Sequence, residues 1–299
     1  MAIIEFIPKA GMLPQYNAHI FNWEVFHAQH VVRLNNKDGK AYFAVTNDKP
    51  RSGFLTIMKT NARVLHADDD LIYPVGESAG RFVWHEVYTP NNPIGNWNHP
   101  GKMAVLDGVL IVAAQNWQDF YPGKSEDSLV WYDISDPVQP KFMAKWTKTE
   151  MGIPDGEVAT VDLVKTMDVK YLVTAGGDHH YVIFKADLVS TKLADWTKFS
   201  DGWFSGQHGS CIRSAQEIVK DGASDYYFDA FREDEVFPFN KFDNNGAKVG
   251  ATNYPNSLPG ADRDWATSSI YVSEKRVPVV YSVKSGAEWN SFRIYQAHL

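Results

Sequence analysis

Three histidines and one glutamate of this 299-residue chain occur at a common position relative to predicted β-strands. Each stands four residues before the first strand residue that is expected to be buried. The four residues, each with the apolar residue that follows it, are His27 with Val31, His99 with Met103, Glu157 with Val161, and His208 with Ile212. A fifth predicted strand has Ala266 at this position, before Ile270. The shared offset indicates that the four polar side chains occupy equivalent positions in a repeated structure.

Imidazole nitrogens and carboxylate oxygens are the usual protein ligands of Zn²⁺, Fe²⁺ and Mn²⁺. The first interpretation is therefore a divalent metal site, and its ligands would be His27, His99, Glu157 and His208. A bound metal would acidify a water molecule and polarise an oxygen atom of a substrate. The second interpretation is a metal-free polar pocket in which these residues act as acid, base or hydrogen-bond donors. The third is a structural role, in which each side chain bonds the backbone of a neighbouring sheet. The sequence leaves the three open.

The elements that carry these residues are short β-strands in a repeated pattern. Residues 97–146 contain four β-type runs. The runs are Met103–Leu106, Val109–Ala113, Ser128–Ile134 and Lys141–Trp146. Asp107-Gly108 is typical of a two-residue hairpin turn with positive φ at both positions, and Ser135-Asp136-Pro137 separates the last two runs. Four antiparallel strands in series are typical of one blade of a β-propeller.

The third of these runs and the turn after it, from Leu129 to Lys141, read Leu-Val-Trp-Tyr-Asp-Ile-Ser-Asp-Pro-Val-Gln-Pro-Lys. This stretch resembles the LVIVD-type repeat, in which an apolar strand is followed by Asp, a Ser-Asp-Pro turn and Pro-Lys. Proteins of that repeat family form β-propellers. The close match spans about one blade, so the resemblance implies a fold and no particular activity.

The four-strand pattern recurs in five copies along the chain. The first runs of the copies are His30–Leu34, Met103–Leu106, Val158–Val164, Cys211–Val219 and Ser268–Ser273. The fifth copy ends after its third run, Phe292–Ala297, whereas Ala2–Ile7 is a β-type run with no hairpin partner. We therefore expect the N-terminal run to supply the missing strand, because that pairing removes exposed sheet edges.

The expected fold is an all-β, five-bladed β-propeller, closed by the N-terminal strand and formed by residues 1–299 as a single domain. A six-bladed propeller and a two-sheet sandwich are the alternatives. In a propeller the first strand of each blade lines the central channel, so residues at the starts of these strands converge at one channel mouth. The three histidines and Glu157 then form one cluster, although 51 to 72 residues separate neighbours in the sequence.

The predicted function is a small-molecule enzyme with one active site at that channel mouth. The reaction would be a metal-assisted or His/Glu acid–base hydrolysis, elimination or isomerisation of a polar or carbohydrate-like substrate, which favours a hydrolase or lyase. The catalytic candidates are Glu157, His208 and Asp264. A non-catalytic propeller that binds a ligand or partner is the alternative. A glycoside hydrolase would need a second carboxylate, and the candidates for it are Asp155 and Asp264.

Composition excludes several other classes. The net charge is −7 and the basic residues are scattered, so neither a nucleic acid nor a membrane is expected as a partner, and a small-molecule ligand is. No phosphate-binding glycine motif occurs, so no nucleotide cofactor is expected. The single cysteine, Cys211, excludes an intramolecular disulfide. The N-terminus lacks the pattern of a signal peptide, which predicts a cytoplasmic protein, with an exported mature chain as the alternative. The oligomeric state stays open.

Overall fold

The computed structural model describes most of the strands together with part of the connecting loops. The described residues are 4–6, 27–37, 40–49, 52–63, 84–88, 97, 99–116, 126–153, 157–165, 171–177, 180–203, 212–220, 223–230, 238–242, 248–253, 268–272, 278–285 and 292–298. Regular structure in these ranges is β-strand, apart from the short helix α1 (Lys148–Met151) and one 3-10 turn (Leu193–Asp195). The prediction of an all-β chain is confirmed. No helix within these ranges is long and apolar enough to span a bilayer.

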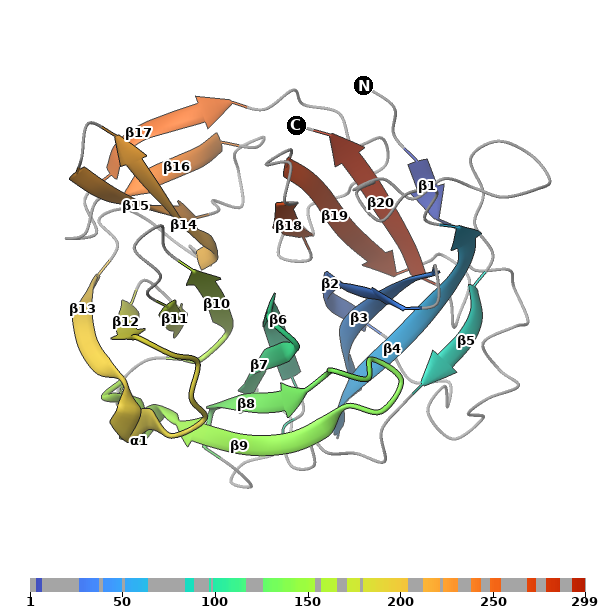
Figure 1. The fold of residues 1–299 in the computed structure, drawn as a ribbon, viewed down its shortest axis with the longest axis horizontal. Helices are drawn as coiled ribbons and strands as arrows, with labels where there is room; N and C mark the ends of the chain where they lie inside the picture. Colours follow the sequence, from blue (N-terminus) through green and yellow to red (C-terminus); the bar gives the residue numbers. More distant parts are fainter. Residues whose placement is uncertain are drawn as a thin grey trace. The chain divides into compact units, whose positions relative to one another are not determined.

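The chain divides into two compact units. Unit 1 contains Met1–Pro100, Ile134–Pro140 and Leu258–Leu299, and unit 2 contains Gly101–Asp133 and Lys141–Ser257. The strands of unit 1 are blue to teal or red in Figure 1, and those of unit 2 are green to orange. That both units belong to one domain stays a prediction.

Unit 1 contains two four-stranded antiparallel sheets. The strands are β1 (Ile4–Phe6), β2 (His27–Lys37), β3 (Lys40–Lys49), β4 (Ser52–Arg63), β5 (Trp84–Tyr88), β18 (Ser268–Val272), β19 (Pro278–Ser285) and β20 (Phe292–His298). One sheet has the order β2-β3-β4-β5, and the other has the order β1-β20-β19-β18 (Figure 1). The first sheet is a meander of four consecutive strands, and the second is a meander of β18 to β20 that β1 completes.

The N-terminal strand completes the C-terminal sheet. Ile4, Glu5 and Phe6 pair antiparallel with Gln296, Tyr295 and Ile294. The predicted pairing of the two ends of the chain is therefore confirmed. Strand β20 has a partner on each side, because β19 pairs with its other edge, and this pairing covers backbone groups that an open edge would expose.

Unit 2 contains two further four-stranded meanders and two hairpins. The strands are β6 (His99–Leu106), β7 (Val109–Gln115), β8 (Ser128–Asp133), β9 (Lys141–Thr147), β10 (Thr160–Lys165), β11 (Tyr171–Gly177), β12 (His180–Ala186), β13 (Thr197–Trp203), β14 (Ile212–Lys220), β15 (Ala223–Ala230), β16 (Pro238–Phe242) and β17 (Lys248–Asn253). The expectation of a continuous fourth sheet is wrong, because β14-β15 and β16-β17 form separate ladders. Pro238 opens β16 without an N–H to donate to a ladder with β15.

The turn between β6 and β7 has the predicted chemistry. Asp107 and Gly108 have φ values of 49° and 79°, so both residues adopt the left-handed conformation. Two such residues match the right-handed twist of the strands that they join. The prediction of a tight hairpin at this dipeptide is confirmed.

The Ser-Asp-Pro turn is held by the carboxylate of Asp136. Oδ1 of Asp136 accepts a hydrogen bond from the Val138 N–H at 3.1 Å. The same oxygen lies 2.8 Å from Nζ of Lys37, at the end of β2. Asp136 therefore both shapes its own turn and joins that turn to another segment of unit 1.

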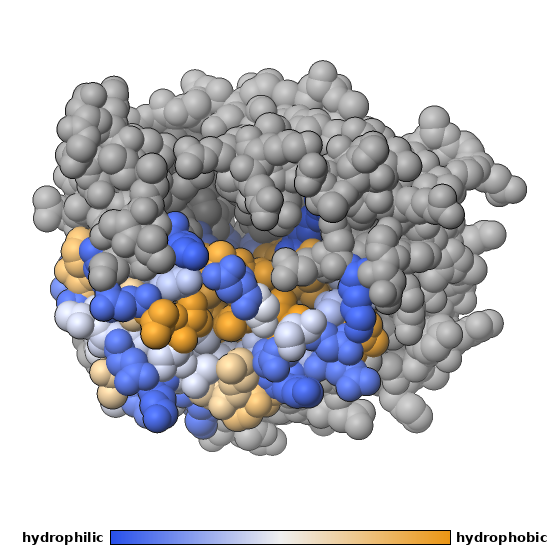
Figure 2. All heavy atoms as spheres, in the orientation of Figure 1, coloured by the Kyte–Doolittle hydropathy of each residue, from blue (hydrophilic) through white to orange (hydrophobic). Residues whose placement is uncertain are grey.

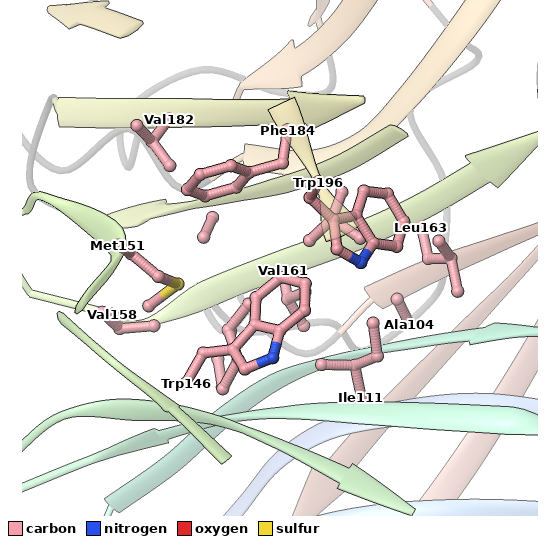
Figure 3. Close-up of a cluster of buried hydrophobic side chains, with 14 of the residues drawn as sticks. Ala104, Ile111, Trp146, Met151, Val158, Val161, Leu163, Val182, Phe184 and Trp196 are labelled. Atoms are coloured by element: carbon pink, nitrogen blue, oxygen red, sulfur yellow. The ribbon is translucent and has the colours of Figure 1, made fainter. Parts of the chain in front are cut away.

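The core of unit 2 is formed around tryptophan side chains. Trp131 and Trp146 have ring centroids 4.5 Å apart, and Trp146 and Trp196 have centroids 5.7 Å apart. The indole N–H groups of Trp146 and Trp196 donate to the carbonyls of Thr191 and Ser190. Figure 3 shows Trp146 and Trp196 within one apolar interior that strands of both meanders line.

The same core anchors the segment that leads to Glu157. Thr147 caps α1, because its side chain accepts the Glu150 N–H while the Glu150 carboxylate accepts the Thr147 N–H. Met151, Ile153 and Val158 are then buried in the tryptophan core, and Figure 3 shows Met151 and Val158 there. Fully burying an apolar side chain of this size contributes about 1.5–3 kcal/mol. The chain is thus fixed on both sides of the loop before β10.

In the first meander of unit 2, burial distinguishes the inner strands from the outer strand. The side chains of β7 and β8 are almost all buried, whereas those of β9 are mostly exposed, including Phe142 and Met143. The visible coloured surface in Figure 2 carries hydrophilic residues along its outer margin and hydrophobic residues nearer its middle. In the first meander the last strand is thus the outer one, and the first three pack inside.

Candidate functional site

The predicted register is present in the backbone, with a correction to the strand starts. His27 and His99 are themselves the first residues of β2 and β6, whereas we predicted that these strands begin at His30 and Met103. Glu157 lies three residues before β10. The strands extend further than the apolar runs because polar residues continue the ladder, as in the pairing of His27 with Asp48.

The residues four positions after His27, His99 and Glu157 are buried, as predicted. Val31, Met103 and Val161 are 0%, 3% and 1% exposed. His208, Asp264 and the side chain of His27 lie outside the described part of the chain. The convergence of the four predicted ligands therefore stays a prediction. Within the described ranges, no group of three His, Cys, Asp or Glu side chains could hold a metal ion.

Buried polar side chains gather where the inner strands of unit 2 begin or end. We call this group, together with the half-buried Glu157, the polar edge. Its buried members are Lys102, Gln115, Asp127 and Thr160, which are 3%, 5%, 8% and 0% exposed. They stand in the first half of β6, at the end of β7, directly before β8, and at the start of β10. Buried charged and polar groups of this kind need hydrogen-bond partners.

Backbone hydrogen bonds join the two meanders at the polar edge. The Lys102 N–H donates to the carbonyl of Ala159 at 3.0 Å, and the Ala159 N–H donates to the carbonyl of Gly176 at 3.1 Å. The same Gly176 carbonyl accepts from Oγ1 of Thr160 at 2.9 Å. Hydrogen bonds therefore join β6 to the segment before β10, and they join that segment to the end of β11.

The absence of a side chain at Gly101 allows this close approach. A Cβ at Gly101 would lie 2.2 Å from the carbonyl oxygen of Ala159, which is a backbone atom and cannot rotate away. Gly101 thus sets the spacing between β6 and the segment that carries Glu157.

Asp127 is a residue of the polar edge that the sequence analysis missed. Its Oδ1 accepts the Asn116 N–H at 2.9 Å, and its Oδ2 accepts the Val158 N–H at 3.2 Å. Its own carbonyl accepts the Lys148 N–H at 2.8 Å. Burial raises the pKa of Asp127, although the two backbone N–H groups and Lys148 oppose the change. The one signal in the sequence was an acidic residue placed directly before a predicted strand.

Glu157 is packed closely against the end of β11. A Cβ at Gly177 would lie 2.8 Å from the carbonyl oxygen of Glu157 and 3.2 Å from its Cβ. Glu157 itself is half-buried. The backbone of Glu157 is therefore confined, while the residue as a whole remains partly exposed to solvent.

No protein-family model and no curated protein matches the chain. The fold is similar to a solved structure from the GH130 family of mannoside phosphorylases, which contains glycoside hydrolases that target β-1,2 mannosidic linkages in Candida mannan. That likeness has a TM-score of 0.51 at 13% identity and covers 92% of this chain and 85% of the other. The GH32 β-fructofuranosidase BmSUC1 of Bombyx mori gives a TM-score of 0.52 at 9% identity, with 90% of this chain and 61% of that chain covered.

Both of these structural neighbours are β-propellers. At identities of 13% and 9% the likeness concerns the fold alone, and it indicates a β-propeller for this chain. That the propeller has five blades stays a prediction, as does the LVIVD-type resemblance.

Proposed function

We propose that this chain is a carbohydrate-acting enzyme that cleaves glycosidic bonds, with Glu157 as a proton donor or acceptor. The support from fold is the likeness to two carbohydrate-acting propellers at TM-scores of 0.51 and 0.52. The observation that carries the proposal is the placement of Glu157, a half-buried carboxylate whose backbone is confined within the polar edge. A group in such a position can exchange a proton with a bound substrate without moving its backbone.

Cleavage of a glycosidic bond by the usual route uses two carboxyl groups, one to protonate the leaving oxygen and one to act as base or nucleophile. Asp127 is unsuited to the second role because both of its carboxylate oxygens accept backbone N–H groups. The candidates that the sequence left open for the second role are Asp264 and Asp155, and we propose His208 for a supporting acid–base role.

A metal-assisted form of the reaction is the second candidate. Its support is the donor set of His27, His99, Glu157 and His208, which suits Zn²⁺, Fe²⁺ or Mn²⁺, and their shared offset. Bound metal would polarise a substrate oxygen. Elemental analysis of the purified protein separates the two candidates: about one metal ion per chain, lost in His99→Ala, supports the metal, and its absence leaves the acid–base form.

The experiment that tests the function is a substrate panel. The purified protein is incubated with β-1,2-linked mannosides and with β-fructofuranosides, with and without inorganic phosphate, and the released sugars are measured. Release without phosphate indicates hydrolysis, and release of a sugar phosphate indicates phosphorolysis. Binding of these sugars without turnover would instead support the non-catalytic alternative and contradict the proposal.

A further inference from the structure

Glu157 lies outside any β-ladder, so other contacts must fix it. Strand β10 begins at Thr160, and Ala159 before it bonds Gly176 of β11 and Lys102 of β6, two residues away from Glu157. A catalytic group must be held within about 0.5 Å of its productive position. The question is which contact holds the backbone next to Glu157.

The carboxylate of Asp127 contacts the residue directly after Glu157. Its Oδ2 accepts the N–H of Val158, the residue that directly follows Glu157, at 3.2 Å. Its Oδ1 accepts the N–H of Asn116, directly after β7, at 2.9 Å. A carboxylate is suited to this task because it offers acceptors on both oxygens and has no N–H to oppose either donor.

Asp127 is itself fixed on its backbone side. Its carbonyl accepts the N–H of Lys148, the first residue of α1, at 2.8 Å. Strand β8 begins at the next residue, Ser128, which is fully buried. The carboxylate therefore projects from an anchored position, and it joins the end of β7 to the segment before β10.

We infer that Asp127 is a positioning residue, whose carboxylate fixes the backbone at Val158 and thereby sets the position of Glu157. The consequence for turnover depends on the proposed function of Glu157, whereas the effect on the backbone does not. Asp127 acts through Glu157 and does not touch the substrate, since it is 8% exposed and both of its oxygens are engaged.

The test replaces Asp127→Asn and uses Glu126→Gln as the matched control. The asparagine has the same shape, but its amide NH₂ cannot accept the second N–H. Glu126 is the neighbouring carboxylate, and its Oε1 accepts the Thr149 N–H at 2.7 Å instead of a group next to Glu157. Both variants lose one negative charge. A difference between them in amide exchange or in kcat therefore reports the loss of the hydrogen bond at Val158 and not the loss of charge.

Two measurements are made on each variant: hydrogen exchange at the Val158 amide, and kcat and KM on the best sugar of the panel. Asp127→Asn should accelerate exchange at Val158 about tenfold, which corresponds to about 1.4 kcal/mol. It should lower kcat about 100-fold with little change in KM, as expected for a displaced catalytic group. Glu126→Gln should leave both readouts close to wild type.

Unchanged exchange at Val158 in Asp127→Asn would overturn the inference, and so would faster exchange with unchanged kcat. The exchange measurement needs no substrate. If the wild type turns over no sugar, the proposed function fails, while faster exchange still supports the role of Asp127 and unchanged exchange still overturns it.

Discussion

Phe6 of the first strand pairs with Ile294 of the last strand, so the two ends of the chain share one sheet. This pairing predicts that deletion of residues 1–8 destabilises the protein strongly, because the deletion exposes an edge of β20. A loss of about 3 kcal/mol would lower Tm by about 5 °C in a chain of 299 residues, because the entropy of unfolding grows with chain length. Thermal unfolding followed by circular dichroism measures the effect. Deletion of residues 1–3 alone, which precede β1, is the control and should change Tm little.

Gly101→Ala should destabilise unit 2, because the added Cβ would lie 2.2 Å from the Ala159 carbonyl oxygen. Forcing an extra methyl group into a packed site costs about 1–3 kcal/mol. Gly202→Ala is the control, because the atoms nearest to its Cβ would belong to the phenol of Tyr181, with the closest at 3.1 Å. Urea denaturation compares the two variants. Equal stability of both would contradict the close approach between β6 and the segment before β10.

The raised pKa of Asp127 predicts how the free energy of unfolding depends on pH. Burial raises the pKa of Asp127 in the folded protein, so the folded state binds this proton more tightly than the unfolded state does. The stabilising contribution is complete below the unfolded pKa of about 3.9 and is lost as the pH rises through the folded pKa.

The free energy of unfolding of wild type minus that of Asp127→Asn should therefore fall as the pH rises through that window. Urea denaturation at a series of pH values measures the difference. A difference that grows with pH would show that the two backbone N–H groups outweigh burial, with the folded pKa lowered instead.

Much of the fold was predictable from the sequence because its signals are local. Asp107-Gly108 specified a hairpin, and β-type runs of residues specified most strands. The pairing of β1 with β20 followed from a missing strand at one end and an unpaired run at the other. The split between β15 and β16 was missed, because which neighbouring strands pair depends on tertiary contacts that a run of β-type residues does not show.

The candidate site was only partly predictable. The offset of His27, His99 and Glu157 was visible because it depends on counting along the chain. Asp127 was missed because the sequence shows two adjacent acidic residues, Glu126 and Asp127, and no local pattern marks either of them as buried. Only folding buries one of the two, and the backbone donors that bind it come from Asn116 and Val158. Burial and partners of that kind are tertiary properties.

The most direct test of the central claim is the kcat/KM of Glu157→Gln on the best sugar of the panel, beside wild type and Glu126→Gln. Removal of an acid–base group that acts in the reaction should lower kcat/KM by about 10²–10⁴-fold. Circular dichroism and Tm should stay at wild-type values, because Glu157 is half-buried and outside the tryptophan core. We expect the loss of kcat/KM in Glu157→Gln together with near-wild-type kcat/KM in Glu126→Gln. Wild-type kcat/KM in a folded Glu157→Gln protein would contradict it.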